Sequence, residues 1–336
     1  MSLQLQAGAL TDVGRERAEN QDAIGHTRIP GASVWYVCDG MGGHLGGSTA
    51  SRLAIEGIDE TLKQTHDSLH DAIDAAMQEA NRRIHQMSTS RRELHNMGTT
   101  AVLVAIEDSG NVIVAHVGDS RAYLLRDNTI RQLTRDHTMV QRLVDDGVIE
   151  PEAAENHPHS NYISRSLGGR EAVDVEFNPE PITTVDGDIF MLCSDGLHGL
   201  VKEPDMAVTM RAMPPEDSAA QLIDMANEAG GHDNISVQVV LHGPMPGPLE
   251  RDNVIHERPP RLFRPTPVAE EHVDVSETPH EGLSLQDPAP AAAPAAAPAP
   301  AEPDADQNSD DDHVLAAIVA ACAVIAVVFY FMIRVV

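Results

Sequence analysis

The stretch Val34-Trp35-Tyr36-Val37-Cys38-Asp39-Gly40-Met41-Gly42-Gly43-His44 joins an apolar run to a carboxylate and a group of glycines. The apolar run predicts a buried strand, because a short uninterrupted run bounded by glycine is typical of a packed core. The strand would hold Asp39 still at its end, and the glycines would let the backbone approach an ion or a phosphate. Alone, the stretch is more typical of a plain Asp-Gly turn.

The same pattern recurs twice further along the chain. Ile189-Phe190-Met191-Leu192-Cys193-Ser194 is a second apolar run, and it leads into Asp195-Gly196. A third carboxylate, Asp233, follows two glycines and precedes the apolar run at residues 237–241. Three aspartates at strand edges suit a hard divalent cation, which prefers oxygen ligands. The repetition therefore favours a common metal site over three unrelated turns.

Composition excludes several classes of function. The 336-residue chain has 52 Asp plus Glu against 23 Lys plus Arg, and its formal charge of −29 argues against a nucleic-acid partner. Aromatic residues make up only 3%, too few for base-stacking platforms. Three cysteines cannot form a disulfide framework, which fits a reducing compartment. Residues 1–30 show no signal-peptide pattern.

The sequence divides into three parts. Residues 1–242 have the periodicity of a globular domain, whereas residues 243–312 are rich in Pro and Ala and predict an acidic, extended linker. Residues 314–333 carry no charge and are long enough to span a bilayer as a helix. We therefore expect a single-pass protein of the cell membrane, anchored by its C-terminal helix, with the catalytic domain in the cytoplasm.

Hydrophobic periodicity places the elements of the domain. Strands are predicted at residues 4–11, 34–38, 99–107, 112–118, 121–125, 186–193 and 235–241, and helices at 48–64, 68–88, 137–146 and 215–228. Hairpins alternate with helix pairs, which favours an α+β fold of antiparallel sheets covered by helices over a doubly wound parallel sheet.

Two further polar motifs are ambiguous by themselves. Arg17-Ala18-Glu19-Asn20-Gln21-Asp22 contains an arginine suited to bidentate phosphate binding and a carboxylate suited to a metal's outer shell, yet it also reads as a polar loop. Gly118-Asp119-Ser120-Arg121 reads as a hairpin turn with a salt bridge.

Taken in order, the motifs resemble a known family. They are Arg-x-x-Asn-x-Asp, Asp-Gly-Met-Gly-Gly-His, Met-Gly-Thr-Thr, Gly-Asp-Ser-Arg, Leu-Thr-Arg-Asp-His-Thr, Ser-Asp-Gly-Leu and Asp-Asn-Ile-Ser, spread over residues 5–241. This set is similar to the bacterial metal-dependent protein serine/threonine phosphatases of type 2C, the PPM family. The resemblance implies a four-layer α-β-β-α sandwich of two antiparallel sheets flanked by helix pairs.

The resemblance also implies roles for individual residues. Asp39 would bridge two Mn²⁺ or Mg²⁺ ions, and the Gly40 carbonyl, Asp195 and Asp233 would be further ligands of these ions. Asp22 would hold metal-bound waters, and Asp119 would bind a third ion more weakly. Arg17 would bind the substrate phosphate, and Asn234 would orient Asp233 or its waters. Residues 138–167 would form the variable flap beside the cleft.

Two positions depart from the family pattern. Many members have Glu where this chain has Gln21, so a water-mediated carboxylate contact becomes an amide contact. Eukaryotic members place a histidine, a candidate general acid, directly after the Asp-Gly pair, where this chain has Met41. Bacterial members commonly share the methionine, and His44 is the candidate acid here.

The expected reaction is hydrolysis of phosphoserine and phosphothreonine by a water or hydroxide that bridges the two ions. The implied partners are phosphorylated proteins, among them a serine/threonine kinase, and no nucleic acid. Two alternatives stay open from sequence. One is a catalytically weak regulatory module, which metal titration would distinguish. The other is a two-metal hydrolase of small phosphate esters, which a comparison with phosphopeptides would distinguish.

Overall fold

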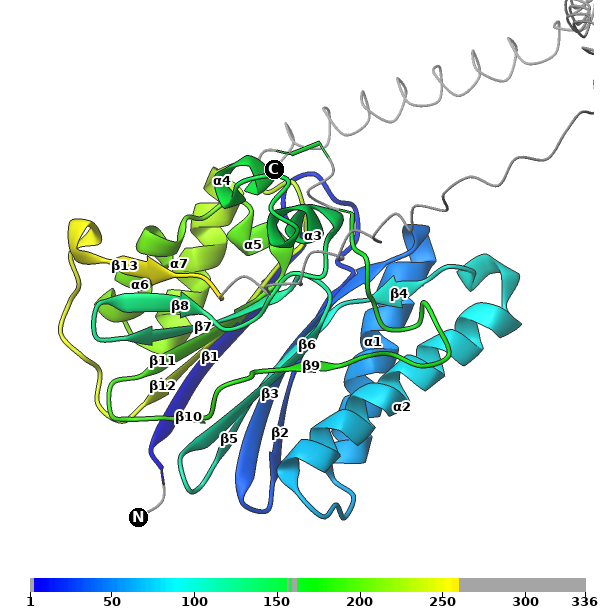
Figure 1. Ribbon diagram of the computed structural model, residues 1–336, viewed down its shortest axis with the longest axis horizontal. Coiled ribbons are helices and arrows are strands. Elements are labelled where there is room, and N and C mark those ends of the chain that lie inside the picture. The colour runs from blue at the N-terminus through cyan, green and yellow to red at the C-terminus, as the bar shows by residue number, and fades with distance from the viewer. Residues whose placement is uncertain (1–2, 156, 159–161, 260–336) are drawn as a thin grey trace, which may run out of the picture. The chain divides into compact units, whose positions relative to one another are not determined.

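The computed structural model describes residues 3–155, 157–158 and 162–259. Two sheets lie face to face within this part (Figure 1). The six-stranded sheet has the order β1 (Leu5–Asp12), β12 (Ile235–His242), β11 (Ile189–Cys193), β7 (Arg121–Arg126), β8 (Thr129–Gln132) and β13 (Ile255–Glu257). The seven-stranded sheet has the order β10 (Ile182–Thr183), β6 (Asn111–Val117), β5 (Ala101–Glu107), β3 (Ala32–Met41) and β2 (Asp22–Ile29), with β4 (Gly98–Thr99) beside β3 and β9 (Glu176–Phe177) beside β6.

Helices cover the outer faces of both sheets. Helices α1 (Gly43–Leu62) and α2 (Leu69–Ser90) pack on the seven-stranded sheet, and α5 (Asp195–His198), α6 (Glu203–Ala212) and α7 (Pro215–Glu228) pack on the six-stranded sheet. Helices α3 (Met139–Asp145) and α4 (Pro151–Glu155) belong to the segment expected to form the flap. Short 3₁₀ turns occur at Arg92–Leu94 and Arg251–Asn253. The predicted antiparallel α-β-β-α sandwich is confirmed, apart from the parallel pairing of β13 with β8.

Strand β3 shows how the apolar run builds this sandwich. Side chains alternate along a strand, so Val34, Tyr36 and Cys38 pack toward α1 and α2, whereas Trp35 and Val37 pack between the two sheets. Both faces are therefore buried, which explains why the run is apolar without interruption. It ends at the edge of the interface between the sheets, where Asp39 lies.

The helices follow local sequence signals. Helix α2 begins after Ser68, whose hydroxyl accepts a hydrogen bond from the Asp71 N–H, as an N-cap does. Helix α7 begins with Pro215 and carries acidic residues in its first turn, which suits the positive end of the helix dipole. Its predicted bounds match the observed helix.

Several boundaries differ from the predictions. Helix α1 begins at Gly43 instead of residue 48, because positive φ angles at Gly42 and Gly43 turn the chain directly from β3 into the helix. Asp22 opens strand β2, which pairs with β3 along its whole length although its own apolar pattern is weak.

The cysteines Cys38 and Cys193 are buried strand residues, as predicted. Burial raises the pKa of both thiols, so neither is suited to act as a thiolate nucleophile at neutral pH.

The predicted membrane helix at residues 314–333 and the linker from residue 260 onward lie outside the described residues. Within residues 3–155, 157–158 and 162–259, no helix is both long and apolar enough to cross a bilayer. Residues 243–259, which the sequence analysis places in the linker, contain the turn Arg251–Asn253 and strand β13.

Candidate metal centre

The seven-stranded sheet supplies two carboxylates to one site. Asp22 and Asp39 are directly opposite each other in the register of β2 and β3. The backbone of Asp39 is fixed by two threonines, since its N–H donates to Thr100 Oγ1 (3.0 Å) and its carbonyl accepts from Thr99 Oγ1 (2.7 Å). Asp39 is thus held at a fixed point on the strand, as the sequence predicts.

The six-stranded sheet and its connections supply three more carboxylates. Asp119 lies in the turn between β6 and β7, Asp195 is the first residue of α5 after β11, and Asp233 lies just before β12. The negative charges of all three, and of Asp22, act on the carboxyl of Asp39 and contribute to raising its pKa. The structure therefore brings together the five aspartates that the sequence analysis singled out.

Burial makes ionisation of the carboxyl groups in this cluster unfavourable. Burial, reinforced by the neighbouring carboxylates, raises the pKa of Asp39 and Asp119 well above the ordinary range and that of Asp22 to about 7. Burial and the charge of Asp233 likewise raise the pKa of Asp195. A divalent cation among these oxygens would reverse the effect, because it favours the charged form.

Unpartnered oxygens supply the independent observation that the residues fit a metal. Asp22 Oδ1, Asp119 Oδ1 and Asp195 Oδ1 are buried and accept no hydrogen bond from the described part of the chain. Buried polar atoms nearly always have a partner, so orphaned oxygens point to a missing one. All three are carboxylate oxygens, the donors that Mn²⁺ and Mg²⁺ prefer.

Gly40 brings the start of helix α1 against the site. A Cβ at this position would lie 2.2 Å from the Gly47 carbonyl oxygen and 2.5 Å from that of Gln21. Only glycine permits so close an approach of three backbone segments. His44 follows in the first turn of α1, and its assignment as general acid stays a prediction.

Arg17 lies at the open edge of the cluster. Its Nη2 donates to Asp233 Oδ2 at 2.7 Å, and its side chain is 51% exposed. The guanidinium therefore combines a contact to a predicted metal ligand with access to solvent, the two features needed to bind a phosphate beside the metal centre.

Asn234 contacts the predicted ligand Asp233 through its backbone, whereas its side chain bonds to other residues. Its Nδ2 donates to the carbonyls of Val13 (2.9 Å) and Glu19 (3.0 Å), and its Oδ1 accepts from the Gln21 N–H (2.9 Å). Only its backbone N–H reaches Asp233, at Oδ1 (2.8 Å). The side chain thus holds the loop that carries Arg17 and leads to Asp22.

Two residues near the cluster were missed by the sequence analysis. Ser194 Oγ donates to Asp22 Oδ2 (2.8 Å) and accepts from the Ser236 N–H (3.0 Å), so it links the two sheets at the site. His198 Nε2 donates to the Asp119 carbonyl (3.0 Å), and burial lowers its pKa to about 3, which keeps the ring neutral. Ser194 stands in a recognised motif, whereas nothing in the local sequence marks His198.

A second group of potential ligands lies at the base of the predicted flap. The ligand atoms of His116, His137 and Glu176 are within 4.8 Å of one another. The Gly118 N–H donates to His137 Nδ1 (3.1 Å), so the ring proton belongs on Nε2, which lies 3.0 Å from Glu176. In this tautomer Nε2 carries the ring proton, so it cannot bind a cation. The positively charged Arg165 guanidinium also lies close, with Nη1 3.2 Å from Nε2. The group therefore fits a hydrogen-bonded link better than a cation site.

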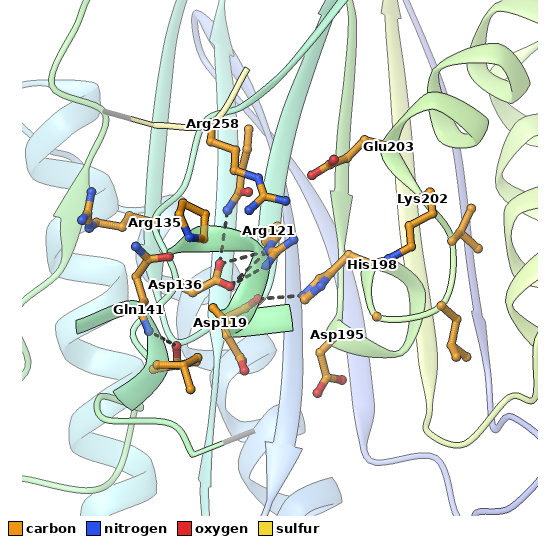
Figure 2. Close-up of a pocket in the computed structure, with 18 of the residues that line it drawn as sticks. Asp119, Arg121, Arg135, Asp136, Gln141, Asp195, His198, Lys202, Glu203 and Arg258 are labelled. Carbon is orange, nitrogen blue, oxygen red and sulfur yellow. Dashed lines mark hydrogen bonds and ion pairs between the residues drawn. The ribbon is translucent and has the colours of Figure 1, made fainter. Parts of the chain in front are cut away.

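A pocket of about 430 Å³ opens from the carboxylate cluster. Asp119, Asp195 and Asp233 are among its lining residues. Residues of α3 and α4 supply apolar side chains, and Lys202, Glu203 and Arg258 line it as well. In Figure 2, Asp119 and Asp195 lie at one end of the pocket, whereas Arg258 and Glu203 lie at the other.

Comparison with known proteins agrees with this geometry. Residues 14–228 match the family model of protein phosphatase 2C. The chain belongs to the protein phosphatase 2C family. Among its relatives, the serine/threonine phosphatase stp of Listeria welshimeri is 38% identical over 237 residues, which are 68% of this chain and 93% of that protein.

Solved protein phosphatase 2C structures share the fold. The crystal structure of Mycobacterium tuberculosis PstP/Ppp is 35% identical, has a TM-score of 0.64, and covers 71% of this chain and 99% of its own. The catalytic domain of PstP in complex with two manganese ions is 34% identical, has a TM-score of 0.62, and covers 72% of this chain and 100% of its own. The expected fold and the expected two-ion cofactor of the family are confirmed.

Proposed function

We propose that this chain is a protein phosphatase that hydrolyses phosphoserine and phosphothreonine on proteins. The observation that carries the proposal is the cluster of buried carboxylates with unpartnered oxygens, assembled from both sheets. Family membership supports the same reaction, because relatives over most of this domain are named serine/threonine phosphatases. The Ser194 hydroxyl, which donates to Asp22, and the thiols of Cys38 and Cys193 are all fully buried, so none of these three groups is exposed to a substrate as a nucleophile.

The proposed division of roles follows the positions of the residues. Asp39, the Gly40 carbonyl, Asp195 and Asp233 would hold two Mn²⁺ or Mg²⁺ ions, and Asp119 would hold a third. Such ions activate a water and neutralise the phosphoryl oxygens when bound. Asp22, whose Oδ2 accepts a hydrogen bond from Ser194, would accept a hydrogen bond from that water.

Substitution of single ligands tests the metal centre. Asp39→Ala, Asp195→Ala and Asp233→Ala should each fold yet lose at least about a hundredfold in kcat, because affinity depends on ligand charge and count. Titration calorimetry with Mn²⁺ and circular dichroism separate loss of metal from loss of fold. The matched control is Asp108→Ala, which removes an exposed carboxylate paired with Arg28.

The chemical course supplies a second criterion. Attack by water on the phosphorus should invert its configuration and leave no phosphorylated residue. A chelator should abolish activity and Mn²⁺ should restore it. Retained configuration, a trapped phosphoenzyme, or full activity in metal-free buffer would refute the mechanism.

We further propose that the enzyme acts at the membrane and reverses serine/threonine kinase signalling, with the kinase itself among its substrates. The uncharged segment at residues 314–333 supports a single-pass anchor, and the Pro/Ala-rich stretch before it supports a spacer. The catalytic domain would then lie on the cytoplasmic side, in keeping with the buried, unpaired cysteines.

A further inference from the structure

The turn between β6 and β7 carries Asp119, and contacts from elsewhere in the chain hold the residues on both sides of it. The Gly118 N–H donates to His137 Nδ1 (3.1 Å). The Ser120 hydroxyl lies 2.7 Å from Thr100 Oγ1, and the same threonine oxygen accepts from the backbone N–H of the predicted bridging ligand. Both neighbours of Asp119 are therefore fixed by segments that are distant in the sequence or belong to another strand.

Helix α5 contacts the backbone of Asp119 itself. The helix begins with Asp195 and ends with His198, so one helical turn carries both a predicted ligand and a histidine. The Gly199 N–H donates to the Asp195 carbonyl (2.8 Å), which closes this turn. His198 Nε2 then donates to the Asp119 carbonyl (3.0 Å). This hydrogen bond links the position of one predicted ligand to that of another.

The carboxyl groups of Asp119 and Asp195 are near each other. Burial and the negative charge of Asp195 both raise the pKa of Asp119. The Oδ1 atoms of both residues are buried and have no hydrogen-bond partner in the described part of the chain. Figure 2 shows both carboxylates directed away from the imidazole of His198, toward the same side of the pocket. A cation between them would offset their mutual repulsion.

We propose that His198 is a positioning residue, which holds the Asp119 carboxylate at the separation from Asp195 that lets the two bind one cation. The inference rests on the proposed function, which places cations at the carboxylate cluster. The imidazole acts through the backbone of Asp119 and touches neither the ion nor the substrate. Loss of this hydrogen bond should therefore weaken the binding of one cation, while the ions held by Asp39 and Asp233 stay bound.

The competing explanation is that His198 only fills space beside the buried ion pair of Arg121 and Asp136, whose atoms lie 2.6 and 2.9 Å apart. Two substitutions distinguish the explanations. His198→Leu keeps an apolar side chain in place but removes the donor, whereas His198→Gln keeps an N–H donor at a similar reach. Space filling predicts that leucine serves at least as well as glutamine, and positioning predicts the reverse.

The test is titration of the full-length chain, in detergent, with Mn²⁺, followed by calorimetry and by the paramagnetic resonance signal of free Mn²⁺. The wild type should bind three ions, one of them most weakly. His198→Leu should weaken this ion by at least about tenfold, whereas His198→Gln should stay within about twofold of the wild type. The matched control is His242→Leu, which removes another buried histidine at the far end of β12 from Asp233 and should leave all three affinities unchanged.

A double substitution shows whether His198 acts through Asp119. Asp119→Asn should remove the weakest ion by itself. Adding His198→Leu to that variant should cause no further change in Mn²⁺ binding, because the carboxylate that the histidine positions is already lost. A further loss of affinity in the double variant would contradict the assignment, since the histidine would then act on the other ligands.

The outcomes separate this inference from the proposed function. Two bound ions in the wild type, unchanged binding in His198→Leu, or an equal loss in the leucine and glutamine variants would each refute the positioning role. Parallel assays use phosphoserine peptides and a small ester, para-nitrophenyl phosphate. The expected binding pattern without hydrolysis of any phosphopeptide would refute the proposed function alone, and phosphopeptide hydrolysis with unchanged binding in His198→Leu would refute the positioning role alone.

Discussion

Burial raises the pKa of single carboxyls in the cluster and so favours their protonated form, whereas a divalent cation would favour the charged form. Asp22 is the clearest case, because burial opposes its ionisation more strongly than its hydrogen bonds with Ser236 and Ser194 favour it. Metal binding should therefore release protons and strengthen as pH rises. The same residue makes the stability of the metal-free protein depend on pH.

The sign of this effect can be predicted. The pKa of Asp22 is about 7 in the folded chain against an ordinary 3.8. A carboxyl whose pKa is higher in the folded chain than in the unfolded chain contributes stability that is fully present at pH values below the unfolded-state pKa. This contribution is lost as the pH rises through the folded-state pKa. In metal-free protein, the Tm advantage of Asp22→Asn over wild type should grow between these two pH values. Calorimetry across this range checks it, and a constant difference would contradict it.

Gly40 allows a second prediction about a single residue. Gly40→Ala should destabilise the metal-free protein by about 3 kcal/mol, because the new methyl group would overlap two backbone oxygens that cannot move independently. Urea unfolding measures the loss. Gly247→Ala is the control, since a Cβ there would meet nothing within 4 Å. Similar stability of the two variants would show that the backbone yields at Gly40.

Among the elements, those with a strong apolar period could be predicted and those held by tertiary contacts could not. The run before Asp39 and the period of α2 carry their own signal. Strand β13 has none: its residues are all exposed, its neighbourhood is rich in proline, and it forms because Arg251 and the edge of β8 hold it.

The residues of the site also fall into two groups, those that could be predicted from the sequence and those that could not. Asp39, Asp195 and Asp233 share a strand-edge pattern, which made them recognisable. The places of Ser194 and His198 depend on partners far away in the sequence. Such pairings arise only in the folded chain, so local sequence gives no sign of them.

Removal of β13 should weaken the fold without abolishing it. A chain ending at residue 242 should unfold a few degrees below one ending at residue 259, because it loses one exposed edge strand, one surface ion pair and the packing of the half-buried Leu249 and Val254 against the core. Both should hydrolyse para-nitrophenyl phosphate with Mn²⁺. Thermal unfolding and ester hydrolysis measure the two effects. Complete unfolding of the shorter chain would mean that β13 is essential to the fold.

For the whole molecule, the proposed C-terminal anchor would decide where the enzyme acts. The full chain should pellet with membranes and need detergent for release, whereas deletion of residues 314–333 should leave an active protein in the supernatant. Cell fractionation with an activity assay on each fraction measures this. A full-length protein recovered entirely in the supernatant would contradict the anchor.

Asp22 and Asp39 lie on one sheet, whereas Asp195 follows a strand of the other sheet. This division has a consequence for how the enzyme matures after synthesis. Neither sheet alone contains the full set of ligands. The cation can be retained only after the two halves have docked. Manganese uptake during refolding would therefore lag behind the recovery of secondary structure, and a newly made chain would stay inactive until that late step.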